Sequence, residues 1–139
     1  MSTEQNKAIV RRMYEILTTG NLDALDEVIA ANLADHNPAP GLASGLDGTK
    51  QWFAMLRSAF PDFRLTIADM IAEGDKVVAR VTVQSTHRGE FMGIPPTGTQ
   101  VTITGIDIVR IARGQIVERW GEFDNMGMMQ QLGVIPSQG

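Results

Sequence analysis

The 139-residue chain contains no cysteine, which excludes disulfide bonds, thiolate metal sites and a cysteine nucleophile. No apolar run approaches the roughly 20 residues that a membrane-spanning helix needs, and the polar N-terminus lacks the apolar core of a signal peptide. Lysine and arginine number 12 against 16 acidic residues and form no run that could neutralise phosphates. We therefore expect a soluble, cytoplasmic protein that binds neither nucleic acid nor membrane.

Chemical motifs are also few. The chain has two histidines, His36 and His87, and no paired spacing of histidine and carboxylate that is typical of a metal site. The glycine-rich patterns of nucleotide sites are absent, and so is the G-x-S-x-G turn that carries a serine nucleophile. The sequence thus predicts no metal and no cofactor.

What is present is the composition of an ordinary globular protein, with 43% hydrophobic and 20% charged residues. The length fits one domain, which we place at residues 1–139 with 134–139 as a tail. A domain of this size can hold a core together with a pocket.

The first part of the chain has the periodicity of helices. Ser2 begins the pattern of a capping box, apolar residues follow at helical spacing, and Gly20 is a typical C-terminal stop. A second helix over about 21–31 is predicted in the same way, as is a third that begins at Asp47 and ends before Pro61.

From Phe63 onward the period of the apolar residues changes to two, which indicates strands. Helices segregated from hairpin-linked strands indicate an α+β fold. We expect a curved, mostly antiparallel sheet, an α+β barrel that wraps around three N-terminal helices and leaves a cone-shaped apolar pocket. The expected strands are one from Phe63 and those at 77–87, 101–111 and 116–124, and a short helix is expected at 125–131.

The densest group of candidate catalytic residues lies in the last hairpin. Asp124 ends its second strand and precedes the terminal helix, where a carboxylate is either a helix N-cap or a general acid/base. Alternation along the strand places Glu118, Trp120 and Glu122 on the face of Asp124. The charge of Glu122 and the apolar ring of Trp120 would both favour a protonated carboxyl, as acid/base catalysis needs.

A second pair of charged residues lies on the first strand of this hairpin. Asp107 and Arg110 are three residues apart, so they point to opposite faces of a regular strand. Each is expected to pair across the hairpin instead, with Glu118 or Arg119, as a solvated ion pair.

The methionines of the terminal helix have two interpretations. They either fill the core or provide soft side chains around a bulky, flat, apolar ligand. His36, in a proline-flanked loop, is more typical of a structural hydrogen bond than of a catalyst. The methionines are Met126, Met128 and Met129.

Longer segments carry a family resemblance. They are His87–Gly98 (HRGEFMGIPPTG), Ile106–Arg110, Gly114–Glu118, Trp120–Asp124 and Gln130–Gly133, together with Phe60–Phe63 and Asp35-His36. Over nearly the whole chain, their content, order and spacing resemble the SnoaL-like polyketide cyclases of the nuclear transport factor 2-like superfamily.

The resemblance implies a cone-shaped α+β fold and an intramolecular aldol cyclisation that needs neither metal nor cofactor. It implies that Asp124 is the catalytic acid/base and that a small apolar, polyketide-like molecule is the substrate. The residues that we expect to bind this substrate are Tyr14, His36, Trp52, His87, Arg110, Trp120, Glu122 and Met128.

Two alternative functions stay open. Limonene-1,2-epoxide hydrolase, which shares the superfamily, uses an Asp-Arg-Asp arrangement, and Asp107, Arg110 and Asp124 supply those residue types. A module that only binds a ligand is the other alternative. The sheet of this fold normally exposes one face, which favours a homodimer. The residues expected on that face are Thr82, Gln84, Thr102 and Thr104.

Overall fold

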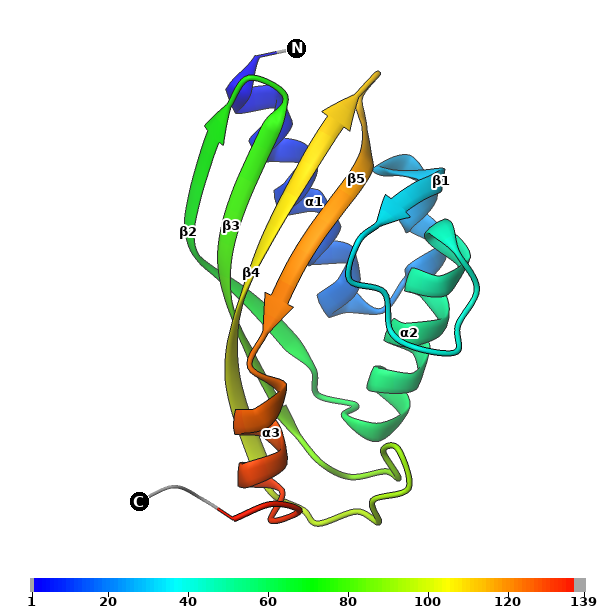
Figure 1. Cartoon of the computed structure of the whole chain (residues 1–139), viewed down its shortest axis with the longest axis vertical. Helices are drawn as coiled ribbons and strands as arrows, with labels where there is room; N and C mark the ends of the chain where they lie inside the picture. The colour runs from blue at the N-terminus through cyan, green and yellow to red at the C-terminus, as the bar shows by residue number, and fades with distance from the viewer. Residues whose placement is uncertain (1, 137–139) are drawn as a thin grey trace.

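The computed structural model describes residues 2–136 and confirms the expected α+β class (Figure 1). The elements are α1 (Thr3–Thr19), the 3-10 helix η1 (Leu22–Glu27), β1 (Ile29–Asp35), α2 (Gly45–Ala59), β2 (Arg64–Glu73), β3 (Lys76–Thr86), β4 (Gln100–Ala112), β5 (Gln115–Phe123) and α3 (Asn125–Gln131). None of the described helices is both long and apolar enough to cross a membrane. Of the tail expected at 134–139, residues 137–139 lie outside the described residues.

The sheet has five strands in the order β1-β5-β4-β3-β2. All neighbours are antiparallel except β1 and β5, which run parallel. Along β3 and β4 buried and exposed residues alternate, because α1 packs on β2 and β3 while α2 packs on β1. One face of the curved sheet is therefore covered by helices (Figure 1). We call the other face, which no helix of residues 2–136 covers, the open face.

The ends of α1 follow the expected signals. The Ser2 hydroxyl accepts a hydrogen bond from the Gln5 N–H at 3.1 Å, and the Gln5 side chain accepts one from the Ser2 N–H at 2.8 Å. This reciprocal pair is a capping box. At the other end Gly20 has φ 88°, a left-handed conformation that glycine adopts without strain.

The segment expected as a second helix is different. It forms η1 only as far as Glu27 and then becomes β1. The Ile116 N–H donates to the Val28 carbonyl at 2.8 Å, and Ile29 lies opposite Ile116 of β5. Pairing with a distant strand thus overrides the local helical spacing of this segment.

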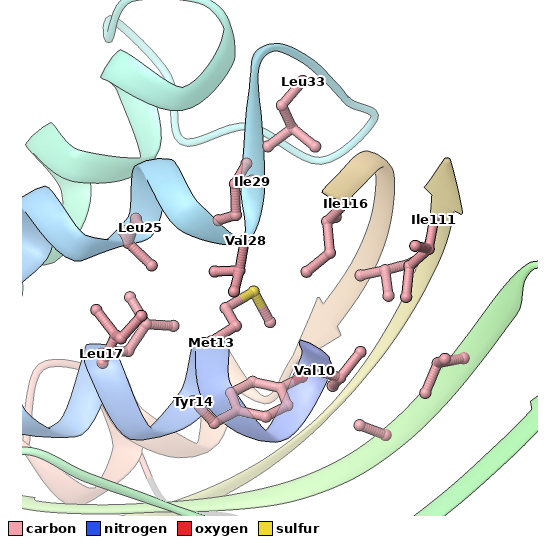
Figure 2. Close-up of a cluster of buried hydrophobic side chains, with 14 of the residues drawn as sticks. Val10, Met13, Tyr14, Leu17, Leu25, Val28, Ile29, Leu33, Ile111 and Ile116 are labelled. Carbon is pink, nitrogen blue, oxygen red and sulfur yellow. The ribbon is translucent and has the colours of Figure 1, made fainter. Parts of the chain in front are cut away.

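The core has two parts. Figure 2 shows the first, the upper cluster, between α1, η1, β1 and the β4–β5 hairpin. Its buried members include Val10, Met13, Tyr14, Ile16, Leu17, Leu25, Val28, Ile29, Leu33, Ile111 and Ile116. The second part, the lower cluster, lies near α3, and its buried members are Ala59, Phe60, Phe63, Val83, Phe91, Val101, Ile103, Met128 and Leu132.

The terminal helix closes a gap in the sheet. Strand β5 ends at Phe123, opposite Gly105, so the first residues of β4 have no strand beside them on that side. There the Gln131 side chain of α3 replaces a strand. Its amide oxygen accepts from the Thr102 N–H at 2.9 Å, and its amide nitrogen donates to the Thr102 carbonyl at 2.8 Å.

Candidate functional site

A polar network lies on the helix-covered face of the sheet. The Tyr14 hydroxyl of α1 donates to Asp107 Oδ2 of β4 at 2.6 Å. The other carboxylate oxygen of Asp107 accepts from Arg119 Nε and Nη2 of β5, both at 3.0 Å. Arg119 Nη1 donates to both oxygens of Asp35 in β1, at 3.0 and 3.2 Å. Four elements of the fold thus meet through these four side chains.

The network contains two carboxylates and one guanidinium, so its formal charge is −1 when Asp35 and Asp107 are ionised. Burial opposes the charge of Arg119, but the charges of Asp107 and Asp35 outweigh it and raise the pKa of Arg119. Burial, together with the negative charge of Asp107, raises the pKa of Tyr14 far above its ordinary value. Tyr14 is therefore a neutral hydrogen-bond donor to Asp107.

Gly121 lies so close to the network that a side chain at this position would overlap it. A Cβ atom at this position would overlap the Arg119 guanidinium and would lie 2.6 Å from Asp107 Oδ1. The Gly121 N–H donates to Asn37 Oδ1 at 2.9 Å, which ties the loop after β1 to β5. Any side chain at position 121 would displace the ion pair of Asp107 and Arg119.

A second cluster lies on the open face. Glu118 accepts from Arg110 Nε at 2.8 Å and lies 2.7 Å from His36 Nε2. The hydrogen bond from Arg110, followed by that from His36, lowers the pKa of Glu118. The Trp120 ring stacks on His36 with centroids 4.8 Å apart, and Lys76 Nζ lies 5.4 Å from the Trp120 ring.

This cluster corrects the expected pocket wall. Glu118, Trp120 and Glu122 do share one face of β5, but it is the open face, because their strand neighbour Gly121 lies opposite Asp107, which faces α1. Arg110 and His36 lie on the open face with them. Trp120 therefore does not shield Asp124 from water.

The expected hairpin pairs are confirmed. Arg110 pairs with Glu118, and Asp107 pairs with Arg119. The second pair is not solvated as expected, because only 5% of Asp107 is exposed. Asp107 and Arg110 face opposite sides of the sheet, so the structure does not assemble the expected trio of Asp107, Arg110 and Asp124.

Asp124 is the N-cap of α3, as one interpretation predicted. Its Oδ1 accepts from the Gly127 N–H at 2.9 Å, while Oδ2 has no hydrogen-bond partner among residues 2–136. A Cβ atom at Gly127 would overlap Oδ2. The residue is exposed, contrary to the expected apolar surroundings. It nevertheless borders the lower cluster, because Phe123 packs against this cluster and Met128 belongs to it.

The remaining candidates lie in or beside the lower cluster. Trp52 of α2 is half-buried, with its ring 6.0 Å from that of Phe91, and Met128 is 8% exposed. His87 is fully buried in this conformation. Its Nδ1 lies 3.0 Å from Thr97 Oγ1 and accepts from the Thr97 N–H at 3.3 Å.

The described surface has hollows in other places. One of about 430 Å³ lies between α1 and β2, and one of about 250 Å³ lies beside the hairpin turns near Asn6. Neither is lined by Trp52, Phe91 or Asp124. Phe60, Phe91 and Met128 of the lower cluster are buried by other side chains in this conformation.

The model of the SnoaL-like polyketide cyclase family matches residues 7–132. The chain belongs to this family. Among characterised relatives of the SnoaL-like chain is the aklanonic acid methyl ester cyclase DnrD of Streptomyces peucetius. It is 29% identical, over 96% of this chain and 92% of the relative.

Solved structures agree with this assignment. TsrD of Streptomyces laurentii superposes with a TM-score of 0.89 at 27% identity, over 97% of this chain and 99% of TsrD. IdmH of Streptomyces antibioticus, for which polyketide cyclase activity has been proposed, has a TM-score of 0.83 at 34% identity. That comparison covers 93% of this chain and 99% of IdmH.

The sequence does not predict two members of the buried network, Arg119 and Asp35, or the adjoining Asn37 as site residues. Arg119 was expected only as a partner for the charges of β4, and Asp35 only as part of a matching segment. Asn37 had no signal except its place in a proline-flanked loop. Strand alternation was the available signal, since it separates Arg119 from the face of Trp120.

Proposed function

We propose that this SnoaL-like chain is a cyclase-type enzyme that performs cofactor-independent acid/base chemistry on a bulky, apolar, polyketide-like molecule. Asp124 is the acid/base. The observation that carries the proposal is the position of this carboxylate. It borders the lower cluster with Oδ1 fixed by the Gly127 N–H and Oδ2 free of protein partners among residues 2–136.

The chemistry is an intramolecular aldol reaction. Asp124 removes a proton from a carbon activated by neighbouring carbonyl groups, and the electron pair of the broken C–H bond forms an enolate. The enolate carbon then bonds to a ketone carbon of the same molecule, whose oxygen takes the electron pair of the C=O π bond. The carboxylic acid of Asp124 returns its proton to that oxygen. Product and substrate have the same composition, so no co-reactant is needed.

The surroundings of Asp124 support this role. Trp52 and Met129 are partly buried at the edge of the lower cluster and give a flat apolar molecule a surface to pack against. A substrate bound there would cover the exposed carboxylate and remove it from water, which strengthens its interaction with the reacting atoms.

The test is an assay of the purified protein with aklanonic acid methyl ester, the compound in the name of the DnrD relative. We expect an isomeric product of unchanged mass. Asp124→Asn keeps a good N-cap but cannot carry the proton, and should lower turnover by about 10²–10⁴. Asp23→Asn, at an exposed position of η1, is the matched control and should be fully active. Full activity of Asp124→Asn would refute the assignment.

A second candidate function is hydrolysis of an epoxide. The observation that favours it is the Asp35–Arg119–Asp107 arrangement, which supplies the Asp-Arg-Asp residue types without Arg110 or Asp124. Both oxygens of Asp107 are occupied by Arg119 and Tyr14. Arg119 also donates to both oxygens of Asp35, but the Asp35 side chain is 16% exposed against 6% for Asp107, so water can reach Asp35 and this is the group that activates it.

Isotope labelling separates the two candidates. Epoxide opening forms a new C–O bond to water, so reaction of an aryl epoxide in H₂¹⁸O should place one ¹⁸O in the diol, and Asp35→Asn should stop it. Aldol closure incorporates no water oxygen. A protein that binds both compounds and converts neither would be a ligand-binding module.

A further inference from the structure

The lower cluster leaves no space for the substrate that the proposed function requires. Phe60 and Phe91 are each 2% exposed, and Met128 is 8% exposed. A polycyclic molecule can lie against the exposed edge of the cluster at Asp124, but it can enter the apolar interior only if some side chain of this cluster moves away. The structure indicates which one it is.

Most members of the lower cluster are fixed in regular elements. Val83 belongs to β3, Val101 and Ile103 to β4, and Met128 to α3.

All three buried aromatic members lie outside the named helices and strands. Phe60 and Phe63 lie in the short turn between α2 and β2, where the Phe60 N–H donates to the Leu56 carbonyl at 2.7 Å and the Phe63 N–H donates to the Phe60 carbonyl at 3.0 Å. Phe91 lies instead on the long loop between β3 and β4. Its ring contacts two others edge-on or tilted, Phe60 at 5.3 Å and Trp52 at 6.0 Å.

The loop that carries Phe91 contains a small hairpin of its own. The Phe91 N–H donates to the Ile94 carbonyl at 3.0 Å, and the Ile94 N–H donates to the Phe91 carbonyl at 2.8 Å. Between them Met92 and Gly93 have φ values of 50° and 82°, as in a type I′ turn. The two hydrogen bonds join the four residues into one unit, and its tip is exposed at Met92.

Both ends of the loop are anchored. The His87 N–H donates to the Thr99 carbonyl at 2.9 Å, and the Gly98 N–H donates to the His87 carbonyl at 2.8 Å. The Gly89 N–H donates to the Ala59 carbonyl at 3.0 Å. Glu90 and Pro95, between these anchors and the hairpin, make no backbone hydrogen bond among the described residues. Backbone hydrogen bonds thus hold the two ends of the loop, and none of those described holds the hairpin between them to the rest of the fold.

We propose that Phe91 controls substrate binding in the proposed reaction: its ring occupies the substrate's place in the free protein and leaves on the 91–94 hairpin when substrate binds. This inference rests on the proposed function for the identity of the substrate. The ligand is a flat, apolar, polycyclic molecule. The ligand binds only while Phe91 is displaced. Its apparent affinity is therefore its intrinsic affinity multiplied by the fraction of time that the space is open.

The first experiment measures the competition between ring and ligand. The probe is anthraquinone-2-sulfonate, a flat tricyclic compound, and the signal is quenching of Trp52 in a Trp120→Phe background. Phe91→Ala should bind the probe about tenfold more tightly or better, since the open state then needs no displacement. Phe91→Leu should lie between, and it serves as the test if the alanine variant does not fold.

The matched control is Phe63→Ala. Phe63 is a buried phenylalanine of the same lower cluster, and its ring contacts Phe53. It should leave probe affinity within about threefold, although any large-to-small change creates a cavity. Equal tightening by Phe63→Ala and Phe91→Ala would overturn the proposal. So would the absence of binding to both the parent and Phe91→Ala.

The second experiment follows the hairpin itself. Because the chain has no cysteine, Met92→Cys gives a single attachment site for an environment-sensitive fluorophore at a position that is 60% exposed. We expect the label to respond to the probe with the same midpoint as the Trp52 signal. A label at Ile71→Cys, which is 65% exposed near the end of β2, should not respond. Quenching of Trp52 with no response from the label at position 92 would show that the site opens elsewhere.

These outcomes are independent of catalysis. Probe binding requires no proton transfer, so Asp124→Asn should keep the affinity difference between the parent and Phe91→Ala. If that difference holds while Asp124→Asn stays fully active, the proposed function fails and the role of Phe91 stands. If Asp124→Asn is inactive and the difference is missing, the reverse is true.

Discussion

Tyr14 is the single tyrosine of the chain, so its ionisation can be followed without interference. Burial and the charge of Asp107 raise its pKa above the value of about 10 that tyrosine has in an unfolded chain. The stabilisation from its proton is fully present below pH 10 and declines as the pH rises further. We predict that tyrosinate absorbance does not appear near pH 10 in the folded protein and develops only together with unfolding. Titration near pH 10 with native circular dichroism would contradict this.

Replacement of the hydroxyl tests the same contact from the other side. Tyr14→Phe leaves one oxygen of the buried Asp107 without a donor, which should cost about 1–3 kcal/mol of unfolding free energy at neutral pH. The variant should also lose the alkaline decline. Denaturant unfolding at pH 7 and pH 10.5 measures both effects, and equal stabilities of the parent and variant at pH 7 would contradict the structural role.

Gly127 determines where the Asp124 carboxylate lies. Alanine is the better helix former by about 1 kcal/mol, so Gly127→Ala should not lower the melting temperature much. Its Cβ would overlap Asp124 Oδ2, however, and should turn the carboxylate away. We predict a loss of turnover of about tenfold or more, measured against Met126→Ala, an exposed position in the same helix. Unchanged turnover would mean that the carboxylate orientation is unimportant.

At the scale of the elements, α3 depends on the side chain of Gln131. Its amide makes two hydrogen bonds to the Thr102 backbone, where β5 no longer accompanies β4. Loss of two such bonds in Gln131→Ala should cost about 1–3 kcal/mol and loosen the helix that Asp124 caps. Amide exchange should accelerate at Thr102 and in α3, while Val109 in the middle of the sheet serves as the internal reference. Equal protection in both proteins would contradict this.

The sequence predicted those elements whose patterns are local. Buried and exposed residues alternate along β3 and β4. Helix α3 starts after Asp124 as expected, because an N-cap aspartate is a local signal. The prediction of a helix over 21–31 was wrong. The apolar spacing of this segment fits a helix, whereas its structure depends on a parallel pairing with β5 far along the chain. Such a pairing leaves no mark in the segment itself.

Part of the candidate site could also be predicted from the sequence. Alternation correctly grouped Glu118, Trp120 and Glu122, and pairing across the hairpin correctly linked Asp107 with Arg119. Alternation does not show which face of the sheet the helices cover. They cover the face opposite Trp120, so Trp120 does not shield Asp124. The contacts of Tyr14 and Asp35 with the network come from elements remote in sequence, so only the fold brings them together.

At the scale of the whole molecule, the open face is a broad surface that no helix of residues 2–136 covers. The threonines and glutamine expected to line it do share it. Thr82 lies opposite Thr104, and Gln84 opposite Thr102, with buried neighbours on the helix-covered face. Ile106, on the same face, is 46% exposed. A broad sheet face with exposed β-branched residues is suited to contact with another sheet.

We predict that this face joins two copies of the chain in a homodimer. A twofold contact sets each residue near its own counterpart or a close neighbour, so Thr104→Arg would bring two like charges and their desolvation cost into one interface. The variant should be monomeric and folded. Met55→Arg, which adds the same charge at an exposed position of α2, should remain dimeric. Light scattering at micromolar concentration gives the masses, and circular dichroism checks the fold. A parent protein with the mass of one chain would refute the prediction, and a dimer unaffected by Thr104→Arg would place the contact on another surface.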